Sequence, residues 1–114
     1  MSPTYLERLA DRSARTGTVL CLGIDPDPAA LPPGFAPTLD GVERFARLLV
    51  EAAGPVAAAV KPNLAFFEAY GSAGMAALER IRAAVPPDLP HTIQLLTPTA
   101  RLIDTFMPLR QDFL

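Results

Sequence analysis

The 114-residue chain has only one lysine, one cysteine and one histidine, and it has no tryptophan. The lone cysteine, Cys21, excludes an intramolecular disulfide, and the start of the chain shows no charged segment followed by an apolar one, as a secretory signal would. The longest apolar run, residues 55–60, is far too short to span a bilayer. These absences favour a protein of the reducing cytoplasm.

The chain also has no excess of basic charge. Ten Lys and Arg residues stand against twelve Asp and Glu, which gives a formal net charge of -2 and an isoelectric point near 5.2. Binding to nucleic acid or to an anionic membrane through counterion release is therefore not indicated. Half of the residues are hydrophobic, which suffices for the core of at most one domain. A small-molecule partner fits this composition best.

Helical and strand patterns alternate along the chain. Residues 18–24 are a continuous apolar run, which is typical of a parallel strand covered on both faces. Residues 25–37 contain five prolines and are expected to form a stiff loop, because each proline removes a backbone donor. Helices are expected over 4–15, 40–53 and 73–84, and strands over 18–24, 57–61 and 92–96. This order predicts an α/β fold with crossover connections and a parallel sheet.

Smaller features refine these elements. Ser2 or Thr4 is expected to cap the first helix, and Gly17 to end it. In the last helix, Met75, Leu78 and Ile81 are expected to be buried.

Two charged residues fall at the ends of the first two expected strands, where parallel α/β sheets bind their ligands. Asp25 follows the first strand and Lys61 ends the second, so both are expected within side-chain reach of one another. Asp25 could accept a hydrogen bond from a sugar hydroxyl, and Lys61 could hold that aspartate or the same hydroxyls. Asn63, in the next loop, could orient a ligand. The alternatives are that Asp25 only initiates a turn and that Lys61 is a surface lysine.

The remaining chemically capable residues fit structural roles better. Cys21 lies inside an apolar strand and is expected to be a buried, unreactive thiol. His91 precedes the third strand, at the end opposite the expected site, which argues against a metal or general-base role. Phe66 and Phe67 are expected in the core, and Glu68 in solvent or at a cap. The sequence has no Cys/His cluster, Gly-rich phosphate loop or nucleophile elbow.

Two segments, LGIDPDP at residues 22–28 and VKPNLAFFE at residues 60–68, together resemble one enzyme family. In order and spacing they are similar to the orotidine 5'-phosphate decarboxylases of the longer bacterial type. The resemblance covers residues 1–96 and implies the first three strands of a (β/α)8 TIM barrel. The family is homodimeric and converts orotidine 5'-phosphate to UMP and CO2 without cofactor or metal. By this resemblance Asp25 and Asn63 would bind the nucleotide. Lys61 would bind it too and would be the first member of a catalytic Lys-Asp-Lys-Asp network.

The next motif of the family is missing. In the family the third strand runs into Asp-Ala-Lys-Arg, which carries the lysine that protonates the carbanion as CO2 leaves. Here residues 97–100 read Thr-Pro-Thr-Ala, and no lysine follows. If one G were lost just before the aspartate codon, the four codons of that motif would be read in another frame. They would then encode Thr, Pro, a third residue that is Ser or Asn, and Ala. The first, second and fourth of these match residues 97, 98 and 100. We therefore interpret 1–96 as the amino-terminal part of a decarboxylase barrel and 97–114 as a divergent tail, frameshifted under this hypothesis.

The resemblance implies a carbon–carbon lyase of pyrimidine biosynthesis, acting on a nucleotide. Because a whole barrel needs about 250 residues, this chain is expected to be truncated and inactive alone, without its general acid. Two alternatives stay open. One is a non-catalytic half-barrel interaction module that another chain completes, and the other is a related decarboxylase that acts on a different sugar phosphate.

Overall fold

The structure is a computed structural model in which residues 3–90 are described. The elements, in chain order, are α1 (Tyr5–Thr16), β1 (Cys21–Ile24), the 3-10 helix η1 (Pro28–Ala30), α2 (Leu39–Ala53), β2 (Ala59–Pro62), α3 (Ala65–Glu68) and α4 (Gly71–Ala84). The expected third strand, the histidine before it and the tail at 97–114 lie outside the described residues. None of the helices within 3–90 is long and apolar enough to cross a membrane.

The two strands form a parallel sheet, as the alternating pattern predicted. Cys21 is paired with Ala59 at one end of the register and Ile24 with Pro62 at the other. The pairing reaches one residue further, because the Asn63 N–H donates to the Ile24 carbonyl at 2.9 Å. Both strands are shorter than predicted, since the ladder covers four residues of each. The two strand ends nevertheless coincide, as the sequence led us to expect.

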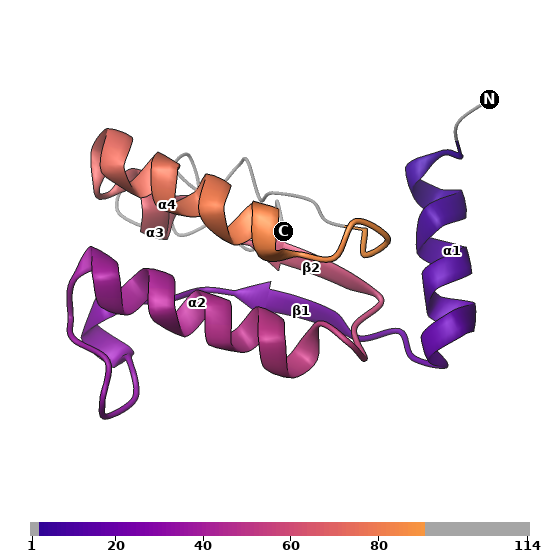
Figure 1. Ribbon diagram of the computed structural model, residues 1–114, viewed down its shortest axis with the longest axis horizontal. Helices are drawn as coiled ribbons and strands as arrows, with labels where there is room; N and C mark the ends of the chain where they lie inside the picture. The colour runs from indigo at the N-terminus through magenta and orange to yellow at the C-terminus, as the bar shows by residue number, and fades with distance from the viewer. Residues whose placement is uncertain (1–2, 91–114) are drawn as a thin grey trace, which may run out of the picture.

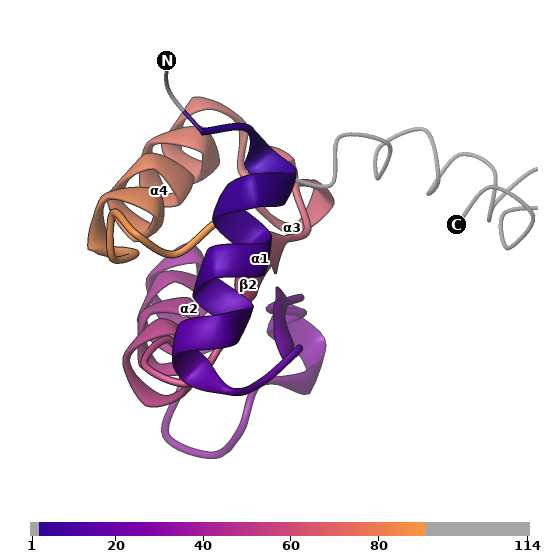
Figure 2. The same ribbon diagram turned by 90° about the vertical axis from the view of Figure 1, so that its right-hand side faces the viewer.

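Helices cover one face of this sheet. Figures 1 and 2 show α2 and α4 side by side on the same side of the strands, and α1 across the end where the strands begin. Ile24 and Val60 face α2 and α4 and belong to the hydrophobic core. That core also contains the following buried side chains of the helices: Val42, Ala46, Val50, Phe67, Leu78 and Ile81.

The opposite face of the sheet is largely open in the described part of the chain, although Ala59 on this face is buried. Cys21, Gly23 and Lys61 alternate with the core residues and are exposed. The prediction of a strand covered on both faces is therefore wrong for residues 3–90, and so is the prediction that Cys21 is buried. The cause is that both covering helices pack against the even-numbered side chains. A continuous apolar run in the sequence does not show whether the helices of the same chain cover one face of the strand or both.

Local signals set the helix ends largely as predicted. Thr4 caps α1 in a reciprocal capping box with Glu7, and Gly17 ends it in a left-handed conformation at φ 71°. Thr38 caps α2 by accepting from the Gly41 N–H. The short helix α3 was not predicted, because a single turn gives no periodic pattern. It places Glu68 in a helix, although the side chain is exposed.

The packing of α4 depends on close contact with α3. Gly74 of α4 lies so near the Phe67 carbonyl oxygen that no Cβ atom would fit between them. Leu78 and Ile81 are buried, as predicted, but Met75 is 40% exposed, which corrects the expectation that it is buried. Phe67 is fully buried, as expected, whereas Phe66 is only partly buried.

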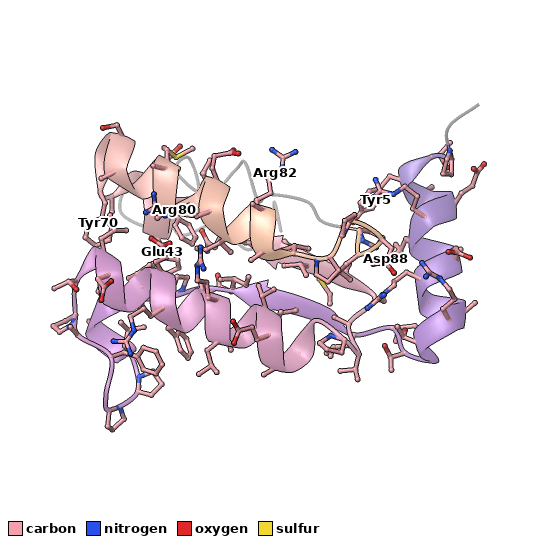
Figure 3. All side chains as sticks on the ribbon, in the orientation of Figure 1. Tyr5, Glu43, Tyr70, Arg80, Arg82 and Asp88 are labelled. Carbon is pink, nitrogen blue, oxygen red and sulfur yellow. The ribbon has the colours of Figure 1, made fainter. Side chains whose placement is uncertain are left out.

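Arg12 joins α1 to the rest of the fold. Its side chain is buried, and its guanidinium donates to the carbonyls of Ala57 and Gly54, at 3.0 and 2.9 Å, and to the Asp88 carboxylate at 2.9 Å. Arg15, one turn later, reaches the same carboxylate at 3.1 Å but is half exposed. Figure 3 shows Asp88 pointing towards α1. One guanidinium thus connects three segments that are far apart in the sequence.

A second ion pair joins α2 to α4. Arg80 donates twice to the Glu43 carboxylate, at 2.8 and 2.7 Å, and the two side chains meet between the helices in Figure 3. The hydrogen bond from Arg80 lowers the pKa of Glu43, although partial burial opposes this effect.

The pKa of Asp88, the acid partner of Arg12, is also lowered. Burial acts to raise this pKa, but a backbone hydrogen bond and the guanidinium groups of Arg15 and Arg12 outweigh that effect.

We predict that Arg12→Ala lowers the free energy of unfolding by about 2–3 kcal/mol, because it leaves buried carbonyls without a donor. Urea unfolding followed by circular dichroism would measure the loss. Arg15→Ala is the matched control, since it removes a guanidinium from the same helix and the same acid partner. That exposed pair should cost less than about 1 kcal/mol. Equal losses in the two variants would contradict the role given to Arg12.

We also predict that the fold loses stability in acid. A carboxyl group whose pKa is lower in the folded chain stabilises the fold above its unfolded pKa, and this contribution disappears as the pH falls through the folded pKa. For Glu43 the loss should therefore begin as the pH falls below its ordinary value of 4.5. Unfolding measured between pH 6 and about pH 3 should show a shallower decline for Glu43→Gln than for wild type. Glu79→Gln, which changes an exposed carboxylate of α4, should keep the wild-type slope.

Candidate functional site

Asp25 and Asn63 meet at the carboxyl end of the sheet. Each directly follows a strand, and the register places them side by side. The Asn63 Nδ2 atom donates to the Asp25 Oδ1 atom at 2.7 Å, a short hydrogen bond of the charge-assisted kind. Asp25 is exposed, whereas Asn63 is only 9% exposed. The structure thus brings together two of the three residues that the sequence singled out.

The Asn63 side chain is held from its other side too. Its Oδ1 atom accepts from the Ala65 N–H at 3.2 Å, at the start of α3. The reversed amide would place two acceptors together at Asp25 and two donors together at Ala65, so the partners fix its orientation. Its main polar atoms are therefore bound within the protein. The prediction that Asn63 could orient a ligand therefore concerns a side chain that already has two partners within the protein.

Lys61 lies on the open face of the same sheet. It is opposite Gly23 in the register, two residues before Asp25, and it is exposed. Within residues 3–90 no ion pair joins Lys61 to Asp25. Both residues lie near the carboxyl end of the sheet, but β2 continues through Pro62, so Lys61 does not end the strand as predicted. The ammonium group remains accessible on the face that the helices leave uncovered.

Gly23 leaves room for the Asp25 carboxylate. A Cβ atom at residue 23 would lie 3.2 Å from the Asp25 Oδ2 atom, closer than an ordinary van der Waals contact. With glycine at this position, the Asp25 Oδ1 atom accepts from Asn63. The Oδ2 atom lies beside Gly23, the residue that is paired with Lys61 in the sheet. The arrangement presents an acceptor and a cation at the same edge of the sheet. Such a pair suits a polyhydroxylated or anionic ligand.

Two of the hollows formed by the described residues lie at opposite ends of the sheet. One of about 170 Å³ is at the carboxyl end, where Asp27 and Pro28 face Phe66, Ala69 and Tyr70. The sequence had not indicated Tyr70 or Asp27, because their contribution depends on how η1 and α3 pack. The larger hollow, about 260 Å³, lies between α1 and the beginnings of the strands.

The larger hollow lacks the chemistry of a site. Apolar side chains such as Leu9, Val19 and Leu20 line most of it, and no carboxylate or basic side chain does so. None of Asp25, Lys61 and Asn63 lines either hollow. We place the candidate site on these three residues at the carboxyl end of the sheet, which is also the end with the smaller hollow. Among the described residues, no group of three or more His, Cys, Asp or Glu side chains could hold a metal ion.

This arrangement defines the class of protein. A parallel sheet with α-helical crossovers and polar residues just beyond the strand ends is typical of α/β enzymes that bind ligands at that edge. No family model matches the chain. It is, however, 40% identical over 87 residues to the orotidine 5'-phosphate decarboxylase of Thermomicrobium roseum, and 38% identical over 78 residues to that of a Roseiflexus species. These matches cover 76% and 68% of this chain but only 31% and 29% of the relatives.

Solved structures show the same relationship. An orotidine 5'-phosphate decarboxylase structure from Streptomyces avermitilis matches with a TM-score of 0.71 and 32% identity, over 93% of this chain and 40% of that protein. The OMP decarboxylase of Leishmania donovani matches with a TM-score of 0.66 and 34% identity, over 80% and 32% of the two chains. The chain is thus homologous to the orotidine 5'-phosphate decarboxylases, and it spans about a third of the length of the curated relatives it matches. This fits a partial, amino-terminal piece of such a protein.

Proposed function

We propose that this chain supplies the ribose-binding portion of an orotidine 5'-phosphate decarboxylase, which converts orotidine 5'-phosphate to UMP and CO2. The observation that carries the proposal is the Asp25–Asn63 contact beside Lys61, formed by the two segments that resemble the family. The free oxygen of Asp25 would accept from a ribose hydroxyl. The Lys61 ammonium would bind the ligand and belong to the catalytic charge network. No cofactor or metal takes part in the proposed reaction.

The chain alone is not expected to turn substrate over. Lys61 is its only lysine, so no second lysine is present to protonate the carbanion that forms when CO2 leaves. Positioned general acids and preorganised charges supply much of the rate enhancement in enzymes, and this chain holds only part of both. In our proposal residues 1–96 are the beginning of a barrel with a third strand over 92–96. The complete enzyme would be a homodimer in the reducing cytoplasm.

We predict that the chain binds UMP weakly through this site. In a titration followed by ¹H–¹⁵N NMR, the amide signals of Gly23, Lys61 and Asn63 should move with UMP concentration. Asp25→Asn should weaken binding by at least about tenfold, since hydrogen bonds to charged groups contribute about 1.5–3 kcal/mol. Glu51→Gln removes an equal charge from the exposed surface of α2 and should leave the affinity unchanged.

Two further measurements distinguish the proposed function from the alternatives. Carboxyl-labelled orotidine 5'-phosphate should release no CO2 above background with the chain alone. If a pentulose 5-phosphate binds more tightly than UMP, the related sugar-phosphate decarboxylase becomes the better assignment. Equal weakening by Asp25→Asn and Glu51→Gln would show that binding is not localised at this site.

The second candidate function is a non-catalytic module that another chain completes. It is favoured by the open face of the sheet and by the exposure of Val19 (89%) and Leu20 (45%) beside the apolar hollow. A stable one-to-one complex with a separate chain carrying the later strands, without decarboxylation, would support this function. Decarboxylation by that complex would instead support the enzyme.

We also propose that residues 97–114 are a frameshifted tail. The test is to sequence the coding DNA from the Pro90 codon through several hundred bases beyond the stop codon and to read all three frames. We expect another frame to continue with Asp-Ala-Lys-Arg and then the later strands. If no frame does so, the tail belongs to the product and the module hypothesis gains.

A further inference from the structure

We propose that Asn63 is a positioning residue, which acts on the ligand through Asp25 instead of touching it. This inference rests on the proposed function, because it treats the Asp25 carboxylate as the group that meets the ribose. The structure supports it through the way the Asn63 amide is used. Its donor goes to Asp25 at 2.7 Å, its acceptor takes the Ala65 N–H at 3.2 Å, and only 9% of the residue is exposed.

The backbone of Asn63 fixes the position from which its side chain contacts Asp25. Its N–H donates to the Ile24 carbonyl at 2.9 Å, so it occupies a fixed place one residue beyond the strand pairing. Because Asp25 directly follows Ile24, the sheet itself sets the separation of the two side chains. The carboxylate of an exposed loop residue would otherwise sample several rotamers. Asn63 selects one of them, in which Oδ1 is held and Oδ2 lies over Gly23.

Asn63 also links the carboxylate to the next element. The same amide that holds Asp25 accepts from the first residue of α3, so the strand end, the aspartate and α3 form one hydrogen-bonded unit. If both bonds are kept, Asn63 could contact a ligand only through the second N–H or the second Oδ1 lone pair of an amide whose residue is 9% exposed. The remaining N–H of the amide is the only donor it could still offer.

The test uses a change that preserves shape and reverses polarity. Asn63→Asp keeps an oxygen to accept from the Ala65 N–H but sets a second carboxylate against Asp25. We expect UMP to bind about tenfold more weakly or worse, with the chain still folded. The swap Asp25→Asn with Asn63→Asp restores a donor–acceptor pair, so it should recover the wild-type melting temperature but not the affinity. Recovery of UMP affinity by the swap would overturn the proposal.

A measurement without ligand separates this inference from the proposed function. Three-bond NMR couplings report whether the χ1 angle of Asp25 is fixed or averaged. We expect a fixed angle in wild type and an averaged one in Asn63→Ala, with Asp27 of the same loop unchanged as the internal control. An averaged Asp25 in wild type, or one unaffected by Asn63→Ala, would overturn the positioning role even if UMP binds.

The two proposals can then fail separately. If Asp25 is ordered by Asn63 but wild type binds no UMP, the positioning role is supported and the nucleotide assignment fails. If wild type binds UMP and Asn63→Asp binds it equally well, the nucleotide assignment stands and the positioning role is wrong.

Discussion

The register between β1 and β2 is the constraint on which the candidate site depends. Pairing Ile24 with Pro62 brings the next residue of each strand, Asp25 and Asn63, into contact without any long loop having to order itself. A slip of one residue would exchange the two faces of the strand and turn the core side chains outward. The burial of Ile24 and Val60 among the helices therefore fixes the register, and the hydrophobic core positions the polar residues at its edge.

The opposite end of the sheet is held by a different kind of interaction. There the carbonyls of Gly54 and Ala57 have left the helix and strand ladders, and Arg12 donates to both. Buried carbonyls without donors are costly, which explains why a charged residue is buried at this position. Hydrophobic packing thus determines the site end of the sheet, while one guanidinium determines how α1 closes the other end.

The sequence predicted the features that depend on neighbours along the chain. Local patterns and parallel-sheet geometry predicted the parallel pairing of the first two strands and the place of Asp25 just beyond β1. They also predicted the caps at Thr4 and Gly17. It could not predict that Cys21 is exposed, because burial of a strand face depends on which elements pack there. It also missed α3, since a helix of one turn has no period to detect, and with it the contribution of Tyr70 to the hollow.

The role of Asn63 shows why a residue type alone does not give a function. An amide side chain beside a strand end can bind either a ligand or a neighbouring carboxylate, because the same N–H and C=O groups can serve both partners. The choice is made by the start of α3, whose N–H occupies the acceptor, and by the strand register, which presents Asp25 to the donor. Neither is visible in the residues 60–68 by themselves. With the amide engaged on both sides, our proposal gives the ligand contacts of this edge to the Asp25 Oδ2 atom and to Lys61.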